Sequence, residues 1–385
     1  MSKKIKLKKL SLRFLIIVLI LFFGAIFLHN FPKKDLSCQN LNSQSEKLIC
    51  WEQLIEKTLK THGIDKAFEI VETLYKEDPI FVSNCHDFVH LIGGKAYLLF
   101  TTNQQFNLSD KTSYCGFGFY HAFMEALILD GADLAKAGEF CDYVDTKMHA
   151  VNADAKGACF HGIGHGVADN HDQKEWNSEE DLTEKALALC KNVSPDDTLL
   201  NRCSSGVFNV LAIAYNNNKL KINPNDPLWY CRGLQNDIYK KTCFEEMNTA
   251  LFVLSGKNFV NAASFIEEIK EDDFAKSGIR SLAGVFGMSL VQGSDSEKII
   301  ENCRNLQTRL IPSCIEGFVA GFIEAGSPSS EYKKALNFCH SSLFTNSEKE
   351  VCFKEALRLS SIFYPKEKQQ QICRLVDENF RVYCQ

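Results

Sequence analysis

The spacing of sixteen cysteines constrains the fold of this chain more than any other feature of its sequence. Six pairs of successive cysteines lie 11–13 residues apart, a seventh pair lies 18 apart, and the last pair lies 30 apart. An even number of cysteines in an exported chain is typical of a disulfide framework. We therefore predict eight bridges between neighbours: Cys38–Cys50, Cys85–Cys115, Cys141–Cys159, Cys190–Cys203, Cys231–Cys243, Cys303–Cys314, Cys339–Cys352 and Cys373–Cys384.

Structural zinc is the alternative role for these cysteines. Zinc sites favour close pairs such as C-x2-C, and no two cysteines in this chain are closer than 11 residues. The same spacing leaves no C-x-x-C motif of the kind that thiol redox enzymes use. Disulfide bridges are therefore the favoured interpretation.

The short cysteine pairs share a sequence context that indicates helical hairpins. An amphipathic run leads into the first cysteine, as in 181–190, and a more apolar run follows the second, as in 203–214. First cysteines recur every 34–49 residues, except for one step of 72 that we expect to contain a cysteine-free hairpin at 265–270 and 279–287. This period is similar to that of TPR-like and HEAT-like helical repeats, although their signature residues are absent.

The predicted fold class is therefore all-α, an α/α-solenoid of disulfide-stapled helical hairpins behind a single N-terminal transmembrane helix. Residues 3–13 hold six basic side chains and no acid, and 14–28 hold no polar side chain. We predict a basic cytoplasmic tail at 1–13, a transmembrane signal-anchor at 14–31 and an extracytoplasmic helical-repeat domain at 36–385. A cleaved signal peptide and a lipid anchor on Cys38 are the alternatives. Signal-peptide cleavage sites have small residues, so the bulky residues at 26–31 favour the uncleaved transmembrane anchor.

Glycine follows the cysteine by three residues in four of the predicted helix openings, at 115–118, 159–162, 203–206 and 314–317. Glycine inside a helix lowers its stability, so a compensating role is expected. We predict that these glycines let neighbouring helices approach closely. Contact between the glycine backbone and a ligand is the functional alternative.

Histidines are concentrated in the first half of the predicted domain, since seven of the ten lie within 85–171. Two i,i+4 pairs place two imidazoles on one helix face, where they can bind one metal ion. Equivalent positions in later hairpins hold Asn209 and Ala320, so repeat packing alone does not require histidine. The candidate ligands, including two carboxylates one turn beyond a histidine, are His86, His90, His121, His161, His165, Glu125 and Asp169.

A ligand set of imidazoles and carboxylates suits zinc, iron or manganese. The main hypothesis is a membrane-anchored binding protein with a divalent-metal site. A hydrolase-type metalloenzyme at the same site is one alternative, because His86-Asp87-x-x-His90 is similar to the H-E-x-x-H motif of zinc peptidases, with Asp in place of the general base. A protein-interaction scaffold with purely structural histidines is the other. The histidines at 149, 171 and 340 are expected to be structural.

The expected partners are the membrane, through the N-terminal helix, and a protein or another component of the cell envelope. A net charge of −5 gives no electrostatic basis for binding nucleic acid, which requires a clustered basic face.

Overall fold

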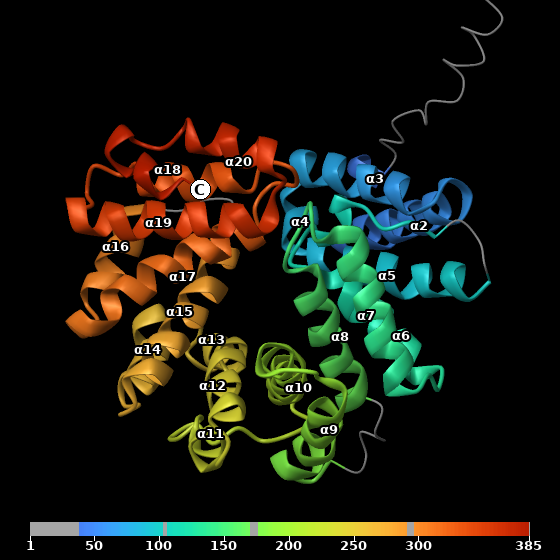
Figure 1. Ribbon diagram of the computed structural model, residues 1–385, viewed down its shortest axis with the longest axis horizontal. Helices are drawn as coiled ribbons and strands as arrows, with labels where there is room; N and C mark the ends of the chain where they lie inside the picture. The colour runs from blue at the N-terminus through green and yellow to red at the C-terminus, as the bar shows by residue number, and fades with distance from the viewer. Residues whose placement is uncertain (1–37, 103–105, 170–175, 291–295, 385) are drawn as a thin grey trace, which may run out of the picture. The chain divides into compact units, whose positions relative to one another are not determined.

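The computed structural model describes residues 38–102, 106–169, 176–290 and 296–384, and within these ranges all regular secondary structure is helical (Figure 1). The predicted tail at 1–13 and the predicted anchor at 14–31 lie outside the described residues. Among the helices in these ranges, none combines the length and the apolar character needed to cross a bilayer. The prediction of an all-helical fold is confirmed.

Internal contacts divide the chain after Trp51 into two units. The described part of the first unit holds the 3-10 helix η1 (Cys38–Asn40) and the beginning of α2 (Gln44–His62), joined by the Cys38–Cys50 bridge. The first half of the second unit contains the rest of α2 and then α3 (Ile64–Glu77), α4 (Pro79–Ser83), α5 (Cys85–Thr101), η2 (Asp110–Ser113), α6 (Gly118–Leu129), α7 (Leu134–Met148), α8 (Ala155–Asp169), α9 (Glu179–Val193) and α10 (Asp197–Asn216).

The second half of that unit continues the same pattern of short helical hairpins. Its elements are α11 (Trp229–Gly233), α12 (Asp237–Glu246), α13 (Asn248–Leu254), α14 (Phe259–Glu267), α15 (Asp272–Ser289), α16 (Ser296–Arg304), η4 (Thr308–Leu310), α17 (Ile311–Glu324), α18 (Tyr332–Cys339), α19 (Asn346–Phe363), α20 (Lys366–Cys373) and η5 (Glu378–Tyr383). The cysteine-free hairpin predicted within the long step is present as α14 and α15.

All eight predicted disulfides are present, and no cysteine is free. Most of them join the end of one helix to the beginning of the next, as Cys190–Cys203 joins α9 to α10. Side-chain caps fix where these helices begin: Ser178 accepts from the backbone of α9, and Asp196 accepts from the backbone of α10. The sequence therefore sets both ends of the connecting loop, and the bridge then holds them together.

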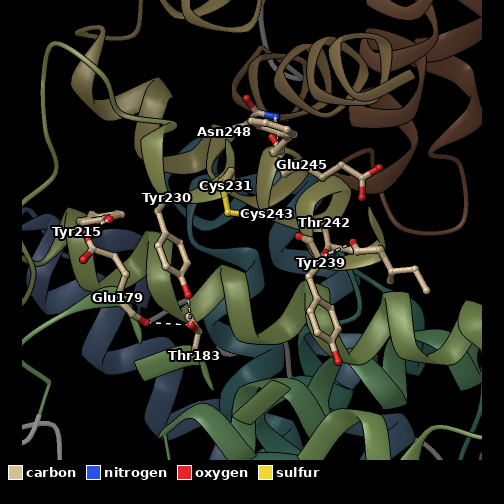
Figure 2. Close-up of a disulfide and its surroundings, with 12 residues drawn as sticks. Glu179, Thr183, Tyr215, Tyr230, Cys231, Tyr239, Thr242, Cys243, Glu245 and Asn248 are labelled. Carbon is tan, nitrogen blue, oxygen red and sulfur yellow. Dashed lines mark hydrogen bonds between the residues drawn. A yellow bond between two sulfur atoms is a disulfide. The ribbon is translucent and has the colours of Figure 1, made fainter. Parts of the chain in front are cut away.

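Figure 2 shows one of these bridges, Cys231–Cys243, which joins α11 to α12. Beside it the hydroxyl group of Tyr230 contacts that of Thr183 on α9, and both side chains are buried. Hydrogen bonds between buried polar groups avoid the cost of leaving either group unsatisfied. The short helix α11 is thereby fixed to the preceding hairpin as well as to its own partner.

The second helices of successive hairpins pack against one another in chain order, from α5 through α6, α8, α10, α12, α15 and α17 to α19. Glycines make this packing close. A Cβ atom on Gly206 would lie 2.0 Å from the carbonyl oxygen of His161, and one on Gly317 would lie 2.1 Å from that of Arg280. No side chain fits at such distances, so the predicted packing role of these glycines is confirmed.

The last hairpins of the second unit contact the first ones, and we call this region the seam. Its contacts are the Tyr75 hydroxyl to the Ala325 carbonyl, the Tyr114 hydroxyl to Ser329 Oγ at 2.8 Å, the Ala153 amide to the Ile362 carbonyl at 2.9 Å, and the rings of Phe117 and Phe363 at 5.6 Å. In Figure 1 the orange-to-red end of the chain accordingly comes next to the blue helix α3. Nothing in the repeat period predicted this closure.

Candidate metal centre

Three successive second helices bring five histidines together. His86 and His90 lie on α5, His121 lies on α6, and His161 and His165 lie on α8. The rings of His121 and His161 are 4.6 Å apart between centroids, and those of His86 and His90 are also 4.6 Å apart. The cluster forms because α6 packs against both α5 and α8.

Glycine makes room for this cluster. A Cβ atom on Gly118, at the start of α6, would lie 2.7 Å from Cδ2 of His90. A Cβ atom on Gly162 would likewise lie 2.6 Å from the carbonyl oxygen of Tyr120, so it would push α8 away from α6. The Cys-x-x-Gly openings thus position the helices on which the histidines lie.

Within the cluster the ring nitrogens converge in two groups of three that share His121. One group is His86, His90 and His121, and the other is His121, His161 and His165; in each group the potential ligand atoms lie within 4.8 Å of one another. Nε2 of His161 lies 3.1 Å from Nε2 of His165, and Nε2 of His90 lies 3.3 Å from Nδ1 of His121. Two nitrogens bound to one tetrahedral zinc ion are separated by about 3.3 Å, so both distances suit a shared cation.

In two of these histidines the ring nitrogen Nδ1 lies beside a group that accepts a hydrogen bond. Nδ1 of His86 lies 2.7 Å from the carbonyl oxygen of Cys115, and Nδ1 of His165 lies 3.1 Å from Oε1 of Glu125. A carbonyl or carboxylate oxygen accepts, so Nδ1 carries the proton in both rings. Nε2 then presents a lone pair toward the cluster, which is the tautomer that binds metals.

A longer chain of hydrogen bonds sets the tautomer of His161. The hydroxyl group of Ser205 on α10 donates to Oε1 of Glu246 at the end of α12, and Asn209 donates to Oε2 at 2.9 Å. Ser205 has one proton to donate, so its oxygen accepts the hydrogen bond from Nδ1 of His161 at 2.9 Å. Nε2 of His161 is therefore also a free lone pair, facing that of His165.

The electrostatic environment favours the neutral form of four of these rings. Burial lowers the pKa of His86 below its ordinary value, and burial together with the neighbouring His86 lowers the pKa of His90 to about 3. Burial and the surrounding imidazoles place the pKa values of His121 and His161 well below the usual range. Neutral imidazole is the form that binds a metal ion, so the cluster is ready to bind one at neutral pH.

Glu125 lies in the cluster as the hydrogen-bond partner of His165. Asp169 is the last residue of α8 and belongs to neither group of converging ligand atoms. Asp87 also lies outside both groups.

Three further histidines were expected to be structural. His149 is exposed and lies 3.0 Å from Asp145, and His340 contacts the Leu375 carbonyl and Asp377. Residue 171 lies outside the described residues.

Ser205 and Glu246 were not predicted from the sequence. Ser205 occupies the position two residues after Cys203 that His161 occupies after Cys159, so an alignment of the helix openings points to it. Glu246 carries no such signal, since its place beside Ser205 depends on how α12 packs against α10.

Comparison with known proteins gives no match to any family model, any curated protein or any solved structure. The fold and the site therefore define the class by themselves. This is a disulfide-stapled, all-helical domain of an oxidising, extracytoplasmic compartment, with a histidine cluster whose geometry can hold a metal ion.

Proposed function

We propose that this protein binds one divalent metal ion, of the zinc, iron or manganese class, through His121, His161 and His165. The observation that carries the proposal is the pair of Nε2 atoms of His161 and His165, 3.1 Å apart, whose rings both have Nδ1 committed to an acceptor. Two lone pairs at that distance repel each other unless a cation lies between them. Zinc, iron and manganese accept imidazole ligands in this arrangement.

We place the ion in the group on α6 and α8 rather than in the group on α5 and α6. Here two of the three rings have their tautomers set, by Ser205 and by Glu125. His121 belongs to both groups, and a neutral imidazole offers only one lone pair. We therefore expect one ion per chain.

The observations favour binding over catalysis. A metallohydrolase needs a carboxylate free to act as a base beside the metal-bound water. Glu125 accepts a hydrogen bond from His165, and Asp87 belongs to neither group of converging ligands.

The protein is proposed to function outside the cytoplasm, anchored in the membrane by residues 14–31, which follow a basic segment.

The experiment is elemental analysis of the full chain, produced in an oxidising compartment, extracted from the membrane fraction in mild detergent and purified without a histidine tag. After loading with Zn²⁺, Fe²⁺ or Mn²⁺ and dialysis, we expect one retained ion per chain. His165→Ala should lose it, whereas His149→Ala, a substitution of an exposed histidine outside both groups, should keep it. A wild-type chain with all eight disulfides formed and no retained metal overturns the proposal and favours an interaction scaffold.

A further inference from the structure

A cavity of about 230 Å³ lies at the seam. Its walls come from the turn before α6, from the end of α17 and from the α19–α20 connection, with Phe117, Glu324, Phe363 and Tyr364 among the lining residues. The cavity does not contain the histidine cluster. It is nevertheless adjacent to it, since Cys115 and Gly116 line the cavity and the Cys115 carbonyl binds Nδ1 of His86.

Glu324 is one of three acidic residues that line the cavity, together with Asp110 and Glu331. Its side chain is solvent-exposed at the cavity wall, and among the described residues it has neither a hydrogen bond nor an ion pair. It is also the last residue of α17, where the unsatisfied carbonyl groups of the helix end add partial negative charge. The protein that surrounds the cavity desolvates this carboxylate and raises the pKa of Glu324 to about 7, and Arg280 and Arg202 only partly offset this effect.

The positive charges near Glu324 are already committed elsewhere. Arg202 is paired with Asp154, and Arg280 is paired with Glu355. The ammonium group of Lys368, which also lines the cavity, lies 5.0 Å from the centre of the Tyr332 ring. Glu324 is therefore a carboxylate at a negative helix end that lacks a paired cation.

Aromatic rings and an unusual backbone turn complete the cavity wall. Cys115, Gly116 and Phe117 have φ angles of 53°, 72° and 60°, three successive left-handed residues of which two are not glycine. Such conformations are costly and are typically retained where they position a functional group. This turn places the Phe117 ring 5.6 Å from that of Phe363, and both residues line the cavity with Glu324.

We propose that this cavity binds a small organic ammonium ion, an ammonium group on an apolar body, with Glu324 as its charged partner and Phe117 and Phe363 as its aromatic wall. An ammonium group gains from a carboxylate, from a helix C-terminus and from aromatic rings, and all three line this cavity. A neutral ligand gains only the apolar contacts, and an anion is repelled by Glu324. Binding at this cavity does not depend on the metal proposed above.

The test is calorimetric titration of the full-length chain with three probes of similar size: 2-phenylethylammonium, 2-phenylethanol and 3-phenylpropanoate. We expect the ammonium ion to bind about tenfold more tightly than the alcohol, and the carboxylate more weakly still. The titrations are done on both chelator-treated and metal-loaded protein. The same preference in both preparations is expected, and this separates the result from that of the metal experiment.

The variant Glu324→Gln should abolish the preference for the ammonium ion. The matched control is Glu316→Gln, which removes another carboxylate of α17 that does not line the cavity and should keep the preference. If Glu324→Gln does not form its eight disulfides, Phe363→Leu serves instead and should weaken ammonium binding severalfold through loss of the ring face. No ammonium binding to the wild-type chain, equal binding of the alcohol, a preference that survives Glu324→Gln, or unchanged ammonium binding in Phe363→Leu overturns the proposal.

Discussion

At the scale of single residues, the hydroxyl group of Ser205 connects the proposed metal ligand His161 to the carboxylate of Glu246. Outer hydrogen bonds of this kind fix the tautomer and the orientation of a histidine ligand. Ser205 therefore acts as a positioning residue, since it touches the ligand and not the proposed metal position. Its contribution should appear in metal affinity and not in the fold.

We expect Ser205→Ala to weaken metal binding by about tenfold to a hundredfold, because Nδ1 of His161 loses its acceptor and the ring is free to change tautomer. The measurement is competition with a chromophoric chelator, with thermal unfolding of the metal-free protein as the second readout. Ser204→Ala is the matched control, because that hydroxyl donates to the Leu200 carbonyl of its own helix. Equal losses of affinity in both variants would contradict a specific role for Ser205.

At the scale of helices, close contact between α8 and α10 determines the position of α8, on which His161 and His165 lie. Gly164 and Gly206 face each other across this contact, and a Cβ atom on Gly164 would lie 2.0 Å from the Cys203 carbonyl oxygen. Each glycine lowers the intrinsic stability of its helix, and the close packing offsets that cost. A methyl group at this contact should separate the helices.

We expect Gly206→Ala to destabilise the protein by about 2–4 kcal/mol, because the backbone of α8 has no room to move away without losing its other contacts. Gly138→Ala on α7 should have the opposite effect and stabilise by about 0.5–1 kcal/mol, since its Cβ atom would make only ordinary contact with Val193, at 3.5 Å. Urea unfolding of both variants measures the difference. A neutral Gly206→Ala variant would show that the close approach is not required.

The helices and their bridges could be predicted from the sequence because they depend on neighbouring residues. Each bridge spans at most 30 residues, and the cysteine-free hairpin at α14 and α15 follows from the repeat period alone. The approach of His121 to His161 is also expected, since adjacent repeats place equivalent positions side by side. The link from Ser205 to Glu246 was not predictable, because it depends on the rotation of α12 relative to α10.

At the scale of the second unit, the seam joins segments that are far apart in the chain. The hydrogen bond from Tyr75 to Ala325 connects residues separated by 250 positions. The closure results from small rotations between neighbouring repeats that add up along the chain. Local sequence patterns do not predict this total rotation. In an open array the terminal repeats have a neighbour on one side only and fray independently, whereas here the two ends contact each other at the seam.

The seam should therefore couple the stability of the two ends. The double variant Tyr75→Phe/Tyr114→Phe removes two hydroxyl groups that contact Ala325 and Ser329, at a cost of about 1 kcal/mol each. We expect faster hydrogen exchange at the amides of both α3 and α19, with α10 and α12 unchanged. Tyr143→Phe, at an exposed position on α7, should leave all four helices unchanged. Faster exchange at one end alone would mean that the two ends are stabilised separately, and that the contacts at the seam contribute little to the cooperative unit.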